Sequence, residues 1–327
     1  MAVVQDRSDG SASAGPSHDP SSGLSARRVT IEPWGVEVGP LGHLAAERAR
    51  LGELAFEHFD VRQQGATIGA VVEGLDLCGP LADGAVAELR TALHEFKVLF
   101  FRDQPLTAAQ HVAFARRFGE LEEHPFIPAN PDQPELVRFA KEATVGGYEN
   151  GWHSDVSWRA RPSLGAVLHA VEIPPVGGDT LFADMYAAYD GLDADVRAQI
   201  DGLTAVHDFT KVFGHMVKDR DKAAMREQYP PVEHPVVRTH PGTGRRLLYV
   251  NRFFVDHIVG IDRDESDELV DRLARQAETV EYQCRFRWET HSVAFWDNRA
   301  VQHYASSDYW PERRVMERAS IVGERPV

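Results

Sequence analysis

The chain has 327 residues, of which 43% are hydrophobic, so it is long enough to bury a large core, and we expect one folded domain. It carries 50 Asp and Glu residues against 35 Lys and Arg residues, a formal net charge of −15. This balance argues against nucleic acid or an anionic membrane as a partner, because both favour basic protein surfaces. The two cysteines, Cys78 and Cys284, are too few for a disulfide framework or a thiolate zinc cluster.

The first 60 residues differ in character from the rest of the chain. Residues 1–26 are rich in Ser, Gly, Ala and Asp, and they lack the charged start and apolar stretch of a signal peptide. They predict a disordered tail on a cytoplasmic protein. Residues 27–60, with a helix expected over 44–59, are interpreted as an N-terminal extension. Residues 61–327 are expected to form the folded domain.

Strands and helices alternate in the first part of that domain. Apolar residues recur every three or four positions over 84–95, which predicts an amphipathic helix. Thr107 is a suitable N-cap for a second helix, which Gly119 would stop. Residues 70–76 and 98–101 have the apolar character of short strands. We expect the two helices to flank a sheet.

Short apolar segments dominate from residue 164 onward. Turn residues separate them, and one helix is expected over 266–278. Such a series of strands favours an antiparallel double sheet, and the periodicity supports a mixed α+β fold. The expected strands are 164–173, 180–182, 247–250, 283–288, 293–296 and 315–322.

A His-x-Asp pair, His153 and Asp155, points to a metal site together with the distant His303. Two imidazoles and one carboxylate form the facial triad that suits Fe(II), which leaves about three positions for a co-substrate and dioxygen. Structural zinc would instead need four closed ligands, often thiolates. The alternative is that His153 is a surface histidine and Asp155 a turn residue, since His-x-Asp alone is a weak pattern.

A cluster of charged residues, 308–318, follows shortly after His303. Arg314 and Arg318 are four residues apart, which on a strand places them on the same face. A guanidinium can hold a carboxylate through two parallel charge-assisted hydrogen bonds. We expect one arginine to hold a dicarboxylic co-substrate and the other an anionic substrate. The alternative for Arg318 is a structural salt bridge with Glu317 or Asp297.

These residues resemble the Fe(II)/2-oxoglutarate-dependent dioxygenases of the taurine dioxygenase (TauD/TfdA) type. The resemblance runs from about Gly69 to Pro326. It implies an α+β fold with a double-stranded β-helix (jelly roll) core and flanking helices, which assigns residues 61–327 to a TauD/TfdA-type dioxygenase domain. The resemblance is carried by segments 152–155, 177–181, 234–241 and 295–323.

The same resemblance implies roles for individual residues. His153, Asp155 and His303 would hold Fe(II), with the first two following one strand and His303 arriving from another. Thr180 and Arg314 would bind the distal carboxylate of the co-substrate 2-oxoglutarate, although Thr180 has the alternative reading of a β-branched residue that only starts a strand. The implied reaction consumes O2, converts 2-oxoglutarate to succinate and carbon dioxide, and hydroxylates a C–H bond of the substrate.

The family's sulfonate-binding set maps onto His124, Arg318 and the backbone of Val156. Glu149 and Ile127 stand where the taurine enzyme has an asparagine and a tyrosine at the amine end of its substrate. Glu149 is therefore expected either to touch the substrate or to be solvated, and taurine itself is disfavoured. Aromatic walls are expected from Phe209, Phe213 and Phe254.

The expected substrate is a small anion, best matched by a taurine-like alkyl sulfonate that would be converted to an aldehyde and sulfite. The same chemistry on an alkyl sulfate ester, a carboxylate of the phenoxyacetate type or an amino-acid-derived metabolite is the alternative within the enzyme class. A non-catalytic jelly-roll binding protein is the alternative outside it, because fold alone does not guarantee chemistry. The resemblance also allows a homo-oligomer.

Overall fold

The computed structural model describes residues 29–33, 36–125, 127–147, 149–214, 218 and 221–327. The chain divides into two compact units, Met1–Gly42 and His43–Val327. The described part of the first unit contains an antiparallel hairpin of β1 (Val29–Ile31) and β2 (Val36–Val38). The tail expected over 1–26 lies outside the described residues.

The second unit begins earlier than the boundary expected at residue 60. Its first helix, α1 (Leu44–Gly52), ends well before the predicted residue 59. Leu51 and Phe59 are buried in a hydrophobic core cluster of the large sheet and its helices. Burial of these apolar side chains ties the segment after Gly42 to the second unit.

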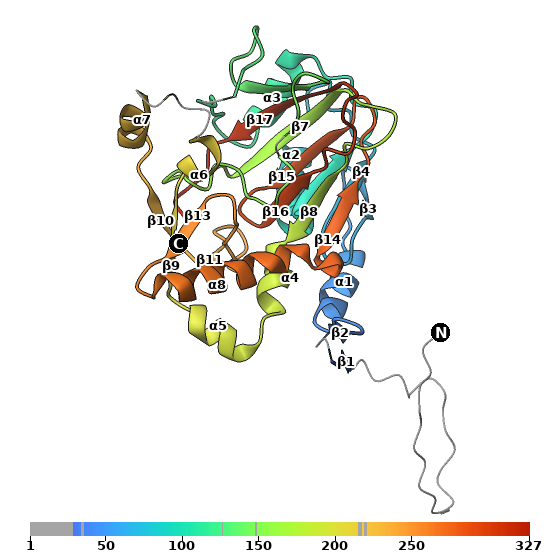
Figure 1. Ribbon diagram of the computed structural model, residues 1–327. Helices are drawn as coiled ribbons and strands as arrows, with labels where there is room; N and C mark the ends of the chain where they lie inside the picture. The colour runs from blue at the N-terminus through green and yellow to red at the C-terminus, as the bar shows by residue number, and fades with distance from the viewer. Residues whose placement is uncertain (1–28, 34–35, 126, 148, 215–217, 219–220) are drawn as a thin grey trace, which may run out of the picture. The chain divides into compact units, whose positions relative to one another are not determined.

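A seven-stranded sheet is the framework of this unit. Six neighbouring pairs form it, all antiparallel except the parallel pair β4–β5. Figure 1 shows the late strand β17 beside β7, which is more than 140 residues earlier in the sequence. The strand order in this seven-stranded sheet is β3 (Asp60–Gln63), β4 (Ala70–Glu73), β5 (Val98–Phe101), β15 (Val293–Asp297), β7 (Gly165–Glu172), β17 (Arg314–Ile321) and β6 (Leu136–Lys141).

Strand β5 shows how the layers form. Successive side chains of a strand point to opposite faces. Leu99 and Phe101 belong to the core cluster shared with α2 (Asp83–Phe96) and α3 (Ala108–Arg116), whereas Val98 and Phe100 belong to a second cluster. The helices predicted in this region therefore cover one face of the sheet, and the Thr107 cap is confirmed by a capping box with Gln110.

A three-stranded sheet covers the other face. Its order is β14 (Gln283–Phe286), β8 (Thr180–Asp184) and β16 (Val301–Ala305). Phe182 of β8 packs against Phe100 and Trp296 of the large sheet, with ring centroids 5.7 and 5.8 Å away. Strands β15 and β16 are consecutive in the chain, so their connecting turn joins the two sheets. The apolar pattern did not predict β16, whereas the family resemblance implied that His303 arrives from a strand.

The remaining elements lie between β8 and β14 in the sequence. The helix predicted over 266–278 is α8 (Arg263–Ala274), followed by the 3-10 turn η2 (Arg275–Glu278). The other helices are α4 (Met185–Asp190), α5 (Ala194–Ile200), α6 (Thr210–Phe213) and α7 (Lys222–Gln228), and the small sheets are β10 (Val232–Pro235), β9 (Thr204–His207) and β13 (Val255–Ile258), with β11 (Val237–Thr239) paired to β12 (Arg246–Leu248).

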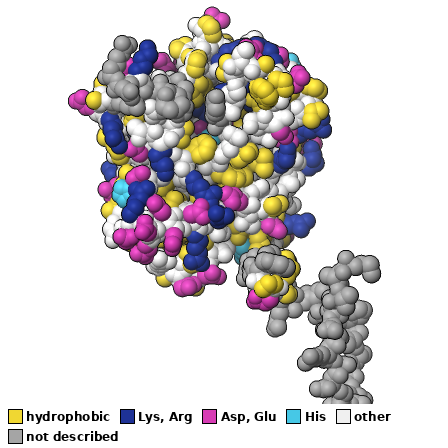
Figure 2. All heavy atoms as spheres, in the orientation of Figure 1, with side chains coloured by type: hydrophobic (Ala, Val, Ile, Leu, Met, Phe, Trp, Pro, Cys, Tyr) yellow, Lys and Arg dark blue, Asp and Glu magenta, His cyan; other side chains and the backbone are white. Residues whose placement is uncertain are grey.

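The surface carries charges of both signs. Figure 2 shows Lys and Arg side chains interspersed with Asp and Glu on the face it presents, with hydrophobic side chains gathered near the middle. No helix among the described residues has the length and apolar character needed to cross a bilayer.

Candidate functional site

The predicted metal ligands converge in the structure. His153 forms an isolated antiparallel bridge with His303 of β16, in which each backbone N–H donates to the other's carbonyl at 3.1 and 2.8 Å. The bridge brings the two imidazole centroids to 4.3 Å. One ligand atom each from His153, Asp155 and His303 lies within 4.8 Å of the other two. The expectation that His153 and Asp155 follow a strand is wrong, because the described residues around them contain no strand: the His153 bridge is isolated and a turn follows it.

The protonation of the three ligands suits a cation. The Nδ1 of His153 lies 2.8 Å from the Gly151 carbonyl, which can only accept, so Nδ1 carries the proton and Nε2 keeps its lone pair. Burial lowers the pKa of His153 and lowers that of His303 to about 3. Burial alone would raise the pKa of Asp155, but the Arg318 guanidinium, together with His303 and His153, more than offsets burial and holds this pKa at about 2. Two neutral imidazoles and one carboxylate result.

Several buried polar atoms at the site have no partner in the described structure. They are Asp155 Oδ2, His303 Nδ1, Arg318 Nε, and both Nε and Nη2 of Arg314. Buried polar groups are nearly always hydrogen-bonded, so unmatched groups clustered in one place indicate a ligand. Asp155 Oδ2 lies 3.8 Å from His303 Nε2, where a metal ion could bind both atoms. The donor set therefore fits Fe(II).

A cavity of about 360 Å³ contains these groups. Arg314 and Arg318 both line it from β17, on the same face of the strand and two pleat repeats apart. Phe213, Phe253 and Phe254 supply aromatic wall. A cavity of this size with apolar walls and a few convergent polar groups has the character of a small-molecule site.

Arg314 and Thr180 lie in this cavity as predicted. The Thr180 hydroxyl accepts a hydrogen bond from Trp288 Nε1 at 3.0 Å, which leaves its own proton available to donate. A Cβ at Gly178 would lie 3.0 Å from Arg314 Nε, so the glycine makes room for the guanidinium. Burial lowers the pKa of Arg314, with Tyr309 and Glu149 opposing that shift.

Arg318 does not form the structural bridges considered as its alternative. Its Nη1 donates to Asp155 Oδ1 at 2.7 Å. Glu317 is bonded instead by Asn130 and Arg138. The guanidinium of Arg318 is thus held against the metal-ligating carboxylate while it faces the cavity.

His124 and Val156 also line the cavity. Val156 has φ of 46°, a left-handed conformation that costs a β-branched residue free energy and that clusters at functional sites. The Nδ1 of His124 accepts a hydrogen bond from the Ile127 N–H at 3.2 Å. Burial, with a contribution from Arg318, lowers the pKa of His124 to about 3, so its imidazole is neutral.

The remaining predicted substrate residues have different environments. Phe254 lines the cavity, but Phe209 lies outside the lining, 2% exposed, and packs on Trp158 at a centroid distance of 5.8 Å. Glu149 lines the cavity, where Lys141 Nζ lies 3.1 Å from its Oε1. The Glu149 carboxylate therefore lies at the cavity with its charge compensated by Lys141.

Phe253 and Lys141 are among the lining residues that sequence reasoning missed. Phe253 stacks on the His153 ring, with centroids 4.9 Å apart and planes within 5°. Its position next to Phe254 was a usable signal. Lys141 lies opposite Arg314 in the β6–β17 ladder, and no sequence pattern gives that register.

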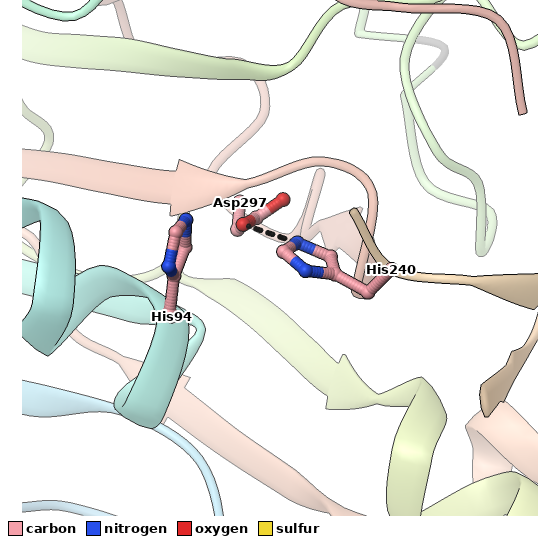
Figure 3. Close-up of side chains that lie close together, drawn as sticks. All are labelled: His94, His240 and Asp297. Carbon is pink, nitrogen blue, oxygen red and sulfur yellow. Dashed lines mark hydrogen bonds and ion pairs between the residues drawn. The ribbon is translucent and has the colours of Figure 1, made fainter. Parts of the chain in front are cut away.

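A second group of potential ligands, His94, His240 and Asp297, also lies close together (Figure 3). Its lone pairs are already used. Asp297 accepts from His240 Nε2 at 2.9 Å and from Arg299 at 2.8 and 2.7 Å. His240 Nδ1 accepts from the Gly242 N–H at 3.1 Å, and His94 Nε2 lies 3.2 Å from Arg299 Nη2. This group is a buried polar network that supports the fold.

Comparison with known proteins identifies the family. The model of a family described as "Taurine catabolism dioxygenase TauD, TfdA family" matches residues 60–320. The chain belongs to the TauD/TfdA family. It is 35% identical over 277 residues to an alpha-ketoglutarate-dependent sulfate ester dioxygenase of Pseudomonas putida, covering 82% of this chain and 91% of that protein.

Two further relatives support the same conclusion. An alpha-ketoglutarate-dependent 2,4-dichlorophenoxyacetate dioxygenase of Cupriavidus pinatubonensis is 35% identical over 278 residues, which cover 79% of this chain and 96% of that protein. The crystal structure of a taurine dioxygenase from Burkholderia xenovorans has a TM-score of 0.73 and 39% identity, covering 83% of this chain and 91% of that chain. The TauD/TfdA protein described here is thus an enzyme, a dioxygenase that uses Fe(II), 2-oxoglutarate and O2.

Proposed function

We propose that His153, Asp155 and His303 hold Fe(II) and that Arg314, with the Thr180 hydroxyl, holds the distal carboxylate of 2-oxoglutarate. The convergence of three ligand atoms within 4.8 Å carries this proposal. The buried, unmatched donors of Arg314 in the same cavity support it, because a dicarboxylate bound to the metal needs a cationic partner for its far end.

The proposed prime substrate is a small organic anion with an apolar body. Arg318, His124 and the Val156 backbone would bind the anionic group, and Phe213 and Phe254 would contact the apolar part. An ammonium group has little to gain here, because Lys141 already neutralises Glu149. An alkyl sulfate or alkyl sulfonate fits this arrangement better than taurine does, and the name of the sulfate ester relative is consistent with it.

The residues divide the work of the reaction. Bound iron supplies the O2-dependent oxidation of 2-oxoglutarate to succinate and carbon dioxide that is coupled to C–H hydroxylation. Arg318 would orient the anion so that the carbon beside it faces the metal, and Phe253 and Phe254 would exclude water. Hydroxylation of that carbon makes an unstable product, which collapses to an aldehyde with release of sulfite from a sulfonate or sulfate from a sulfate ester.

A second substrate class is an aryloxyacetate. The observation that favours it is the aromatic wall of Phe213, Phe253 and Phe254, and the dichlorophenoxyacetate relative is similar over most of the chain.

We also propose that the two facing sheets, whose shared core contains Phe100 and Phe182, form the double-stranded β-helix that the family resemblance implies.

Anaerobic addition of Fe(II) and 2-oxoglutarate tests the first step, because the chelate gives a weak visible charge-transfer band. A persistently colourless mixture would favour a non-catalytic binding protein. Aerobic turnover with hexyl sulfate, hexanesulfonate, phenoxyacetate and taurine then tests the substrate, with succinate and released sulfate or sulfite as readouts. We expect the enzyme to turn over the two hexyl compounds faster than taurine. Faster turnover of taurine would contradict the proposal.

A further inference from the structure

The side chain of Asn298 is bonded to both backbone groups of a proposed metal ligand. Asn298 lies in the turn between β15 and β16 and is 0% exposed. Its Oδ1 accepts from the Asp155 N–H at 2.7 Å, and its Nδ2 donates to the Asp155 carbonyl at 2.9 Å and to the Ser163 carbonyl at 3.1 Å. The carboxamide thus bonds both the N–H and the C=O of Asp155. These two bonds fix the orientation of the Asp155 backbone as well as its position.

This contact links the two parts of the chain that form the metal site. Asn298 starts the turn that leads into β16 and His303, whereas Asp155 belongs to a segment with no strand of its own among the described residues. Further contacts join that segment to β16, among them the His153–His303 bridge and the bond from Ser154 Oγ to the Val301 carbonyl at 2.8 Å. Asn298 bonds the Asp155 backbone, whereas Arg318 bonds the Asp155 carboxylate.

The bond to the Asp155 carbonyl has a second consequence. In a trans peptide the C=O and the following N–H point in opposite directions. Because Asn298 holds the Asp155 carbonyl on its own side of the chain, the Val156 N–H points away from Asn298 within the same peptide plane. Val156 lines the cavity in its left-handed conformation, and no described residue accepts a hydrogen bond from its N–H.

We propose that Asn298 is a positioning residue that serves both ends of the reaction, because one carboxamide sets the Asp155 carboxylate for the metal and aims the Val156 N–H at the substrate anion. This inference rests on the proposed function. It predicts that metal affinity and anion affinity are coupled through a side chain that touches neither ligand.

The chain offers a matched control in Gln104. This side chain is 6% exposed, and its carboxamide also accepts from one backbone N–H, of Leu77 at 2.7 Å, and donates to two carbonyls, of Leu75 at 3.2 Å and Arg102 at 2.9 Å. It does not line the cavity. Gln104→Leu removes one hydrogen bond from a backbone N–H and two to backbone carbonyls, as Asn298→Leu does, but at a place remote from the metal ligands.

The test measures Co(II) binding to the purified full chain by calorimetry, with thermal unfolding of the metal-free protein alongside. We expect Asn298→Leu to weaken Co(II) binding about 10–100-fold, as loss of a group that orients a metal ligand typically does. Gln104→Leu should lower the unfolding temperature comparably and leave Co(II) affinity at the wild-type value.

A second variant separates the two roles and covers the case in which Asn298→Leu fails to fold. Asn298→Asp keeps an acceptor for the Asp155 N–H but removes the donor to the Asp155 carbonyl. We expect it to retain more of the Co(II) affinity than Asn298→Leu, and to bind hexyl sulfate more weakly than wild type in the complex with Co(II) and 2-oxoglutarate.

The possible results separate the inference from the metal-site proposal on which it rests. Wild-type Co(II) affinity in both Asn298 variants would overturn the inference, as would an equal loss of affinity in Gln104→Leu, which would indicate general loosening. If instead the wild-type protein binds no Co(II), or His153→Ala binds it normally, the metal-site proposal itself fails. Loss of hexyl sulfate binding in Asn298→Asp with retained Co(II) affinity would support the role at Val156.

Discussion

Arg314 presents a buried guanidinium with two unmatched donor atoms, Nε and Nη2, to the cavity. We expect Arg314→Ala to weaken 2-oxoglutarate binding by about 2–4 kcal/mol, because the distal carboxylate would then be buried without a partner. The neighbouring Arg313 is a matched control, since its exposed side chain pairs with Glu142 and Glu172 at the surface. Titration of 2-oxoglutarate into the anaerobic Fe(II) protein measures both variants. Equal affinities for Arg314→Ala and wild type would refute the role.

At the residue scale, the sequence could predict ligand identity but not ligand contacts. His153, Asp155 and His303 were visible because the residue types required by Fe(II) occur in a recognisable motif context. The ion pair between Arg318 and Asp155 was not predictable, because it depends on side-chain rotamers and on where β17 lies relative to a turn more than 150 residues earlier. The same limit hid the pairing of Lys141 with Glu149, which removes the free carboxylate that the sequence suggested.

The turn from β7 to β8 is an element whose shape decides a side-chain position. Gly178 has φ of 75°, and a Cβ there would lie 3.0 Å from Arg314 Nε and 3.1 Å from its Cδ. We expect Gly178→Ala to displace the guanidinium and to weaken 2-oxoglutarate binding, in addition to the cost of about 1–2 kcal/mol for a left-handed alanine.

Gly74 provides the comparison. Its φ is 90°, and a Cβ there would meet nothing within 4 Å. Gly74→Ala should therefore carry a similar backbone cost without any change in 2-oxoglutarate affinity. The pair of variants separates backbone strain from displacement of Arg314, and an unchanged affinity in Gly178→Ala would show that the guanidinium tolerates the added methyl group.

At the element scale, the strongest apolar patterns gave correct elements. The helices α2 and α3 and the strand β5 were predicted because their buried faces are continuous and their boundaries carry clear signals such as Thr107. The apolar pattern missed strands β6 and β16 because each mixes charged or polar residues with apolar ones, and two of these polar residues, Lys141 and His303, line the cavity. Function thus obscured the elements that carry it.

For the whole molecule, the burial of histidines predicts acid sensitivity. Burial lowers the pKa of His111 and His303 to about 3 and that of His234 to about 4. An unfolded histidine titrates near pH 6.5, so between these values the unfolded chain binds more protons and the free energy of unfolding rises with pH. The stabilisation is complete above about pH 6.5 and is lost as the pH falls toward 4.

Urea unfolding of the metal-free protein at several pH values checks this expectation. Each such histidine contributes up to about 1.4 kcal/mol per pH unit inside the window. His111→Gln removes one titrating group that lies away from the cavity, so the pH dependence should become shallower in that variant. A free energy of unfolding that is constant from about pH 7 to about pH 5 would contradict the prediction.

The hairpin of β15 and β16 has one strand in each sheet, so the metal centre is joined to both layers. His303 belongs to the smaller layer, and Asp155 is tied through Arg318 to β17 of the larger one. A metal ion bound there would connect the two sheets and oppose any sliding of one sheet over the other. Metal binding should consequently slow amide hydrogen exchange in both sheets, including strands far from the residues that bind the ion.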